Sequence, residues 1–520
     1  MLAATWKHIW LRLFLAACVG GGLTWYVCGH GVAEVPAKIS AGPVSPTSVG
    51  MNLGALNYWS QEFPFADIID NAEIRVVGEG GWKNPEGLIS MNSGGYPVNV
   101  AAGTKLVVII KSGGGDILPV GRYKCTISPG WDVRPSRVAK IRSTSNGFDL
   151  EVLPPPAKGG LYLTLTPSGQ RADLTELSCR SPGVGAKDIF NPVFLADNRY
   201  FSVIRFMDWM KPNLTQRMKW SERTTPASFS QTSKQGASVE YMVALANQLK
   251  ADPWFTMPLE ADDDYYRQFA SYVRDNLRPG QKAYVEVSNE LWNTMFAQSK
   301  MAIAEGKRLY PTVQWDWEAS SLYYADRIRA VMAIWQDVFK GQRGRIVRVY
   351  ATQAGSRRNP TAALSHKDTV KFVDAMAIAP YFGPQRGMPR PGVDATEYVL
   401  THGDEFIDHT IGKALVSKEM AKSFGLPLIT YEGGPDYVSF NRRLMDDFAK
   451  AEHDPRMYDI YMKFLQRWRN EVGGLYVAFD SINHRYGHML YTGQPLSQAP
   501  KMRALVDFIQ KNGTGRVNAG

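Results

Sequence analysis

The chain has 520 residues, of which 44% are hydrophobic and 21% are charged. These fractions are typical of a folded globular protein and exclude an intrinsically disordered chain. The formal net charge is +10, but no run of Lys and Arg has the density of a nucleic-acid-binding arm, so we expect no nucleic-acid partner. The length suffices for one large domain with an additional module.

The first 37 residues have the organisation of an export signal. Lys7 and Arg12 precede an apolar stretch at residues 13–28, and small residues follow at 31–37. A signal peptide has these regions in this order, and the apolar stretch is short for a membrane span. We expect export to the periplasm, to the medium or to the outer face of the inner membrane. A cleaved signal peptide and an uncleaved membrane anchor both remain open, and residues 38–48 read as a linker rich in Pro and Ser.

Apolar runs then alternate with helical patterns, as in β–α units that build a parallel sheet. The expected strands are residues 49–56, 201–209, 254–259, 283–290, 345–352, 375–382, 426–432 and 474–481. Eight strands, each followed by helix, predict a (β/α)8 TIM barrel rather than an open sheet. We assign residues 49–74 and 183–512 to this catalytic barrel and residues 513–520 to a tail.

Residues 75–182 break this rhythm. They are rich in Gly, Pro, Thr and Val and contain short alternating strands, at 105–110, 121–127, 148–152 and 161–166. This pattern predicts an all-β, sandwich-like module inserted after the first βα unit, whose short helix we expect at 64–71. Cys125 and Cys179 both lie in the module. A disulfide between them is plausible in an oxidising compartment, and two buried free thiols are the alternative.

In a (β/α)8 barrel the residues at the C-terminal ends of the strands surround the active site. Glu290 ends strand four and Glu432 ends strand seven, on opposite sides of the mouth. Cleavage of a glycosidic bond needs such a pair, with one carboxyl protonating the leaving oxygen and the other acting as nucleophile or base. One glutamate alone is more often a salt-bridged rim residue, but two on opposed strands favour catalysis. The other polar residues at strand ends are Arg205, Asp208, Glu260, Asn289, Tyr381 and Asp480.

These two segments resemble a known group of enzymes. Residues 285–293, Val-Glu-Val-Ser-Asn-Glu-Leu-Trp-Asn, resemble the Asn-Glu signature on strand four of clan A glycoside hydrolases. Residues 429–434, Ile-Thr-Tyr-Glu-Gly-Gly, resemble the nucleophile segment on strand seven of that clan. Three shorter segments are similar to bacterial barrel proteins labelled cellulose-binding or cellulase-like, at 205–209, 252–255 and 261–265. The resemblance covers about residues 49–510, including the β insertion.

The resemblance implies a retaining mechanism with Glu290 as general acid/base and Glu432 as nucleophile. It also implies that Asn289 binds the sugar 2-hydroxyl and that Tyr381 orients Glu432. Arg205 would hold Glu432 ionised, because a nearby cation lowers the pKa of a carboxyl.

The chain departs from the clan pattern at three strand ends. Strand six lacks the His that many members place before the Tyr. Strand eight has Asp480 where a sugar-stacking Trp is common, and strand three ends in Glu260 rather than His-Asn. These departures affect the subsite for the cleaved sugar and therefore the substrate.

Four tryptophans are candidates for stacking on sugar rings, and core packing is an equally good interpretation of each. They are Trp209, Trp292, Trp315 and Trp317. The acidic run at 262–264 could bind a cation, but we favour a helix N-cap before Tyr265. Because no paired Cys or His spacing, phosphate loop or dinucleotide fingerprint is present, we expect no metal and no cofactor.

We therefore expect a monomeric glycoside hydrolase that cleaves β-glycosidic bonds of an extracellular or envelope polysaccharide, in the endo mode. The departures above motivate an alternative, a non-catalytic protein that binds a cellulose-like polysaccharide on a glycosidase fold. A transglycosylase is a second alternative, because it would use the same two carboxylates.

Overall fold

The structure is a computed structural model. It describes residues 48–512 except 113–117, 155–158, 182, 215–216, 385–387 and 438–440. The expected export signal, nearly all of the expected linker and the expected tail lie outside the described residues. Among the residues that are described, no helix is long and apolar enough to cross a membrane.

Eight parallel strands form the centre of the larger unit, in the order β1, β15, β16, β17, β18, β19, β21, with β23 beside β1. They are β1 (Val49–Asn52), β15 (Val203–Arg205), β16 (Asp252–Met257), β17 (Ala283–Val287), β18 (Ile346–Ala351), β19 (Ala375–Ile378), β21 (Leu428–Thr430) and β23 (Tyr476–Ala478). Each overlaps one of the eight segments predicted as strands. The predicted (β/α)8 architecture is confirmed.

The barrel closes between β21 and β23. The backbone N–H of Thr430 donates to the carbonyl of Leu475 at 2.9 Å. The hydroxyl of Thr430 accepts the N–H of Val477 at 2.6 Å. A side-chain hydroxyl therefore completes the seam where the two strands meet, and the sheet leaves no free edge there.

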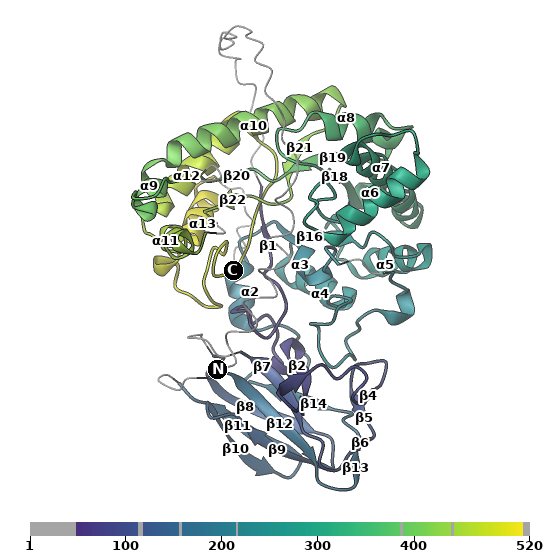
Figure 1. The fold of residues 1–520 in the computed structure, drawn as a ribbon, viewed down its shortest axis with the longest axis vertical. Coiled ribbons are helices and arrows are strands. Elements are labelled where there is room, and N and C mark those ends of the chain that lie inside the picture. The colour runs from purple at the N-terminus through teal and green to yellow at the C-terminus, as the bar shows by residue number, and fades with distance from the viewer. Residues whose placement is uncertain are drawn as a thin grey trace.

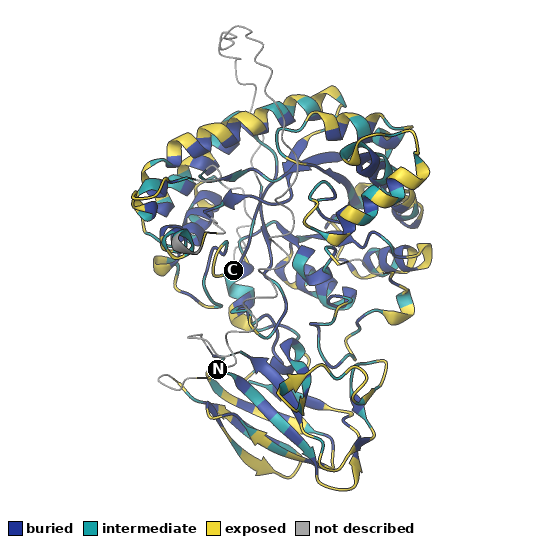
Figure 2. Ribbon diagram, in the orientation of Figure 1, coloured by how far each residue is buried: buried dark blue, intermediate teal, exposed yellow. Residues whose placement is uncertain are grey.

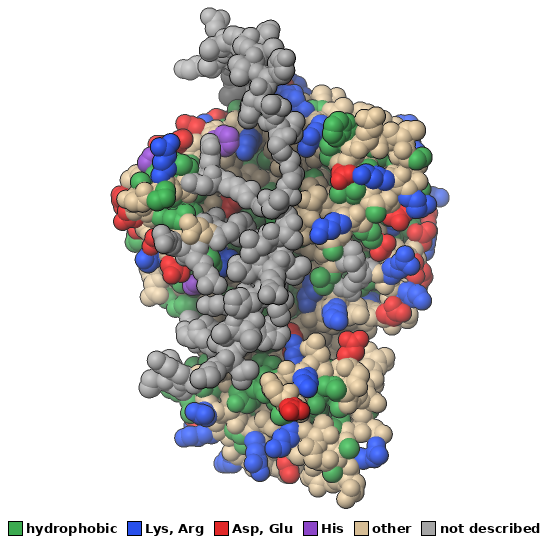
Figure 3. Space-filling model, viewed as in Figure 1, with side chains coloured by type: hydrophobic (Ala, Val, Ile, Leu, Met, Phe, Trp, Pro, Cys, Tyr) green, Lys and Arg blue, Asp and Glu red, His purple; other side chains and the backbone are tan. Residues whose placement is uncertain are grey.

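Helices surround the strands, and Figure 1 shows them as the outer layer of the barrel. They are α2 (Pro192–Asn198), α3 (Met207–Met210), α4 (Val239–Leu249), α5 (Asp263–Asn276), α6 (Ala297–Leu309), α7 (Asp316–Val338), α8 (Arg358–Ser365), α9 (Ala395–Thr401), α10 (Gly403–Ser423), α11 (Arg442–Glu452), α12 (Met457–Arg467) and α13 (Pro500–Asn512). Their outward faces are exposed while the strands are buried (Figure 2). Lys and Arg alternate with Asp and Glu over the face of the barrel in Figure 3, in keeping with a dispersed charge.

Helix α5 begins at the acidic run. The Asp262 carboxylate accepts the backbone N–H of Tyr265 at 2.8 Å, so Asp262 is the N-cap. Asp263 and Asp264 occupy the first turn, where the helix dipole favours negative charge. The N-cap interpretation is confirmed.

Two antiparallel sheets form the smaller unit between β1 and α2 (Figure 1). One contains β3 (Gly81–Lys83), β2 (Glu73–Gly78), β7 (Leu106–Lys111), β12 (Leu161–Pro167) and β9 (Trp131–Pro135); the other contains β10 (Ala139–Thr144), β11 (Gly147–Val152), β8 (Gly121–Ile127) and β14 (Leu177–Arg180). Their facing apolar residues build a core of their own, separate from that of the barrel. Short pairs flank them, β4 (Ser90–Met91) with β5 (Pro97–Val98) and β6 (Val100–Ala101) with β13 (Arg171–Ala172).

The module leaves the barrel where β1 ends and returns where α2 begins, so both connections lie on the side of the barrel mouth. The segment expected as the first helix contains a single 3-10 turn, η1 (Ile68–Asn71). The first full helix of the barrel is α2, after the module. Cys125 on β8 and Cys179 on β14 are register partners, and a disulfide joins them.

Candidate active site

The guanidinium of Arg205 lies inside the barrel at the end of β15 and is fully buried. Nη1 donates to Asn52 at 3.0 Å and to Glu432 at 2.7 Å. Nε and Nη2 donate to Glu286 at 3.1 and 2.9 Å, and Nη2 also donates to Asn289 at 2.9 Å. A guanidinium has five N–H groups, so every donor of Arg205 is used. This full set of partners offsets much of the cost of burying a charge.

Strand alternation brings these side chains together. Successive residues of a strand point to opposite faces, and Val203 lies in the apolar cluster inside the barrel, so Arg205 two residues later also points inward. On β17, Tyr284 packs against the same inner cluster, which places Glu286 inward as well. The ion pair between Arg205 and Glu286 therefore lies one layer above the apolar interior of the barrel.

Glu432 is 5% exposed and is held from both sides. Arg205 donates to Oε1, and the hydroxyl of Tyr381, on β20 (Tyr381–Phe382), donates to Oε2 at 2.9 Å. Burial raises the pKa of Glu432 to about 7, and the charge of Glu290 adds to this, while Arg205 and Tyr381 act in the opposite direction. Arg205 acts on the pKa of Glu432 in the expected direction, but burial outweighs it, and Glu286 shares the same cation.

Glu290 is half-buried and carries a different set of partners. The hydroxyl of Tyr431 donates to Oε1 at 2.9 Å, and the amide of Asn293 donates to Oε2 at 2.9 Å. The backbone has a φ of 45° at Glu290 and 62° at Ser288. Such left-handed conformations cost on the order of 1–3 kcal/mol in side-chain-bearing residues and tend to occur at functional sites. The strained turn after β17 presents Glu290 to the mouth.

Tyr431 connects the two glutamates. It precedes Glu432 in the chain, donates to Glu290, and lies under the guanidinium of Arg205 at 5.1 Å. Burial raises the pKa of Tyr431 well above its ordinary value, so the hydroxyl remains a donor. Tyr431 was not among the residues predicted from the sequence, although the alternation of strand seven, with Ile429 inside the barrel, indicates that it points inward.

Asn289 is 3% exposed, and both ends of its amide are engaged. Its Oδ1 accepts from Arg205, and its Nδ2 donates to Asn213 at 3.2 Å. Gln298 on α6 donates to Asn213 and, at 2.9 Å, to the carbonyl of Asn289. The structure thus fixes the orientation of the Asn289 amide next to Glu290.

Asp208 and Asp480 form a second acidic pair, following the two strands that flank β1. Asp480 is fully buried; its Oδ2 accepts from Asn483 at 3.2 Å, and its Oδ1 has no partner among the described residues. Burial raises the pKa of Asp480 to about 7, and the charge of Asp208 adds to this. Burial likewise raises the pKa of Asp208 to about 6, against the effects of Arg205 and Lys211.

Two of the four tryptophan candidates, Trp209 and Trp292, follow barrel strands but lie in different places. Trp209 is fully buried in the core, with its ring centroid 5.6 Å from that of Phe65 and 5.5 Å from that of Phe206. Trp292 is half-buried at the mouth, 6.2 Å from the ring of Tyr431. Trp209 is therefore a core residue. Of the two, only Trp292 lies beside the glutamates.

Asn52 is a residue of the site that was not predicted from the sequence. Its Oδ1 accepts from Arg205, and its Nδ2 donates to the carbonyls of Tyr431 and Ala478 at 3.0 Å. The end of β1 is thereby tied to β21 and β23. A polar residue closing a short apolar strand is the signal that could have identified it.

No family model and no curated protein matches this sequence. Solved structures that match include a fungal β-1,4-galactanase, at 12% identity over 60% of this chain and 91% of that one, with a TM-score of 0.34. A family 51 α-L-arabinofuranosidase from Bifidobacterium longum matches at 9% identity over 62% and 68%, with a TM-score of 0.38. A GH26 β-mannanase from Bacteroides ovatus matches at 11% identity over 64% and 85%, with a TM-score of 0.35. Each of these three solved structures is a glycoside hydrolase.

Glu62, in the loop that follows β1, is hydrogen-bonded to Ser481, which follows β23. It is buried, and its Oε1 accepts the hydroxyl of Ser481 at 2.6 Å. The same hydroxyl accepts the backbone N–H of Gly54 at 3.0 Å. Burial raises the pKa of Glu62 to about 8, and the charge of Asp480 adds to this. The carboxyl is therefore protonated at neutral pH.

Glu62→Gln should reduce the loss of stability at alkaline pH. A carboxyl whose pKa is raised by folding contributes stability that is present below its unfolded pKa and lost as pH rises through the folded pKa. At about 1.4 kcal/mol per pKa unit, the loss between pH 5 and pH 9 is on the order of 3–5 kcal/mol. Denaturation at both pH values should show the variant more stable than wild type at pH 9 and similar at pH 5. The exposed Glu79→Gln is the control, and an unchanged pH dependence in Glu62→Gln would contradict the assignment.

Proposed function

We propose that the protein is a retaining glycoside hydrolase that cleaves β-glycosidic bonds of an extracellular or envelope polysaccharide. The observation that carries the proposal is the pair of glutamates that end β17 and β21 in opposite environments. Glu432 is buried against a cation and a phenol, as suits a carboxylate nucleophile. Glu290 is half-exposed at the mouth and accepts only neutral donors, as suits a group that exchanges protons.

In the proposed reaction Glu432 attacks the anomeric carbon while the bond to the leaving oxygen breaks. Glu290 gives its proton to that oxygen, and a glycosyl–enzyme ester forms on Glu432. Glu290, now ionised, takes a proton from water as the water oxygen attacks the anomeric carbon. The ester bond breaks, Glu432 leaves as a carboxylate, and the sugar keeps its β configuration. Arg205 and Tyr381 stabilise the departing carboxylate.

Replacing the two glutamates should give different products. Glu432→Gly should lower kcat on a β-glycan by about 10³-fold or more, because the nucleophile is lost. Added azide should restore turnover and yield the α-glycosyl azide. Glu290→Ala with azide should yield the β-glycosyl azide, because the ester still forms on Glu432. Proton NMR of the products distinguishes the anomers.

Glu419→Ala, at an exposed position of α10, is the control carboxylate and should behave as wild type. A Glu432→Gly variant that releases sugar at the wild-type rate would refute the proposed nucleophile. Tight binding of polysaccharides by the wild type without cleavage across a broad panel of β-glycans would instead support the alternative of a carbohydrate-binding protein.

The acid limb of the pH–activity profile should lie near pH 7. The nucleophile must be ionised, and the pKa of Glu432 is raised to about 7, so kcat/KM should rise with pH through this value. Tyr381→Phe removes a hydrogen bond that lowers the pKa and should move the limb to higher pH. Glu286→Gln leaves Arg205 with one fewer anion and should move the limb to lower pH. If both variants keep the acid limb of the wild type, the proposed control of the Glu432 pKa is contradicted.

We also propose that the chain is exported, on the basis of its first 37 residues and of its disulfide in the β module. A disulfide persists in oxidising compartments and is rare in the cytosol. Thiol labelling of the fractionated producing cell should find Cys125 and Cys179 oxidised in the exported protein. The same chain without residues 1–37 should carry both as free thiols in the cytosol. Full-length protein recovered from the cytosolic fraction alone would count against export.

A further inference from the structure

The turn that carries Glu290 has a left-handed backbone on both sides of Asn289. The φ angle is 62° at Ser288 and 45° at Glu290. Such conformations are unfavourable for residues with a side chain, and they persist only where the surrounding structure holds them. The position of the Glu290 carboxyl therefore depends on the contacts that hold this turn.

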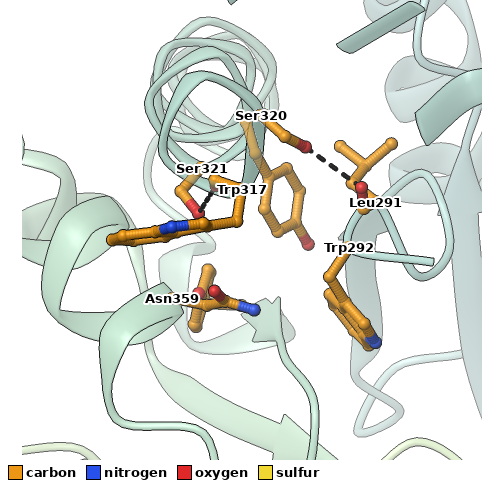
Figure 4. Close-up of a pocket in the computed structure, with 8 residues that line it drawn as sticks. Leu291, Trp292, Trp317, Ser320, Ser321 and Asn359 are labelled. Atoms are coloured by element: carbon orange, nitrogen blue, oxygen red, sulfur yellow. Dashed lines mark hydrogen bonds between the residues drawn. The ribbon is translucent and has the colours of Figure 1, made fainter. Parts of the chain in front are cut away.

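The carbonyl of Leu291, the residue after Glu290, accepts two side-chain hydroxyls. Ser299 on α6 donates to it at 2.7 Å, and Ser320 on α7 donates to it at 3.0 Å. Figure 4 shows the bond from Ser320. A carbonyl oxygen has two lone pairs, so both are used. Two helices thus fix one backbone atom next to Glu290.

This contact lies in the interior of the protein. Leu291, Ser299 and Ser320 are all buried. A buried carbonyl that loses its donors stays without a partner, which is more costly than the loss of an exposed hydrogen bond. The two hydroxyls therefore favour the observed turn over conformations that place the Leu291 carbonyl elsewhere.

The residue before Glu290 is held independently of the two serines. Gln298, also on α6, donates to the carbonyl of Asn289 at 2.9 Å. Asn289 in turn accepts from Arg205 through its Oδ1. Removing the serine hydroxyls therefore leaves Asn289 and Arg205 with their partners, and it frees the turn only from Glu290 onward.

We propose that Ser299 and Ser320 are positioning residues for Glu290. The inference rests on the proposed function, in which Glu290 is the acid/base. By holding the Leu291 carbonyl, the two hydroxyls keep the Glu290 carboxyl where it gives its proton to the leaving oxygen.

The nucleophile does not depend on this contact. Glu432 is held by Arg205 and Tyr381, and neither of these contacts a serine of the pair. Loss of the hydroxyls should therefore impair the steps that need proton transfer by Glu290 and leave the attack of Glu432 on the anomeric carbon intact.

Ser299→Ala and Ser320→Ala, singly and together, test the inference, with Ser321→Ala as the matched control. Ser321 is the neighbour of Ser320 on α7 and is also buried, but its hydroxyl donates at 2.7 Å to the carbonyl of Trp317 within the same helix (Figure 4). Two substrates with the same glycone are compared, a β-linked oligosaccharide that the wild type cleaves and the dinitrophenyl β-glycoside. Dinitrophenolate leaves without a proton, whereas a sugar oxygen needs the proton of Glu290.

General acid catalysis contributes about 10²–10⁴-fold, so the double variant should lose about tenfold or more in kcat/KM on the oligosaccharide. On the dinitrophenyl glycoside its kcat/KM should equal that of the wild type. Each single variant should lose less on the oligosaccharide, because one hydroxyl still binds the Leu291 carbonyl. Ser321→Ala should match the wild type on both substrates.

The second step gives a separate measurement. Glu290 also takes the proton from water when the ester on Glu432 is hydrolysed, so the double variant should have a lower kcat on the dinitrophenyl glycoside. Azide attacks the ester without a base, so added azide should restore this kcat and yield the β-glycosyl azide. A variant with a purely structural defect would not recover in azide.

Equal losses on both substrates would overturn the inference, because the serines would then act on folding or on the glycone. A double variant that matches Ser321→Ala on the oligosaccharide would overturn it as well, and the proposed function would stand if Glu432→Gly is inactive. If the double variant does not fold, the single variants decide by the same comparison of substrates. A wild type that cleaves neither substrate refutes the proposed function, and the inference fails with it.

Discussion

The buried guanidinium of Arg205 is the interaction on which the catalytic end of the barrel depends. It binds side chains that lie within or after three other strands, β1, β17 and β21, and so links all three to its own β15. Removing one partner of a buried ion pair typically costs about 3–5 kcal/mol, because the remaining charge stays unpaired. Since all five N–H groups are used, no rotation of the guanidinium preserves the set. Arg205 therefore both stabilises this end of the barrel and positions Glu432.

In the same cluster one cation, Arg205, faces two carboxylates, Glu286 and Glu432. This imbalance influences the pKa values of the three groups. Both partners raise the pKa of Arg205, although burial acts against this, so the guanidinium stays charged. One cation does not offset the effect of burial on two carboxyls, so burial raises the pKa of both Glu286 and Glu432. Burial also raises the pKa of Asp208 and of Asp480, which follow the strands on either side of β1. Burial thus raises the pKa of several carboxyls at this end of the barrel above their ordinary values.

Much of the barrel could be predicted from the sequence, because short apolar strands that alternate with helices leave few alternative folds. The two glutamates could be placed because strand ends converge at one mouth. What could not be predicted depends on three-dimensional packing. Trp209 and Trp292 look alike as aromatics after a strand, yet one fills the core and the other reaches the mouth. The net direction of the Glu432 pKa required knowing how deeply Glu432 lies and that Glu286 competes for Arg205.

Tyr431 and Glu432 are adjacent in the chain, and one binds the acid/base while the other is the proposed nucleophile. A rigid shift of the end of β21 would therefore move Glu432 and Tyr431, the hydrogen-bond donor to Glu290, together. The relative placement of the two carboxyls is buffered against small movements of that strand. Movements of β17 reach Glu432 by a second route, because Glu286 and Asn289 in that segment both bind Arg205, which in turn binds Glu432. Both strands are therefore coupled to the spacing of the two carboxyls, one through Tyr431 and the other through Arg205.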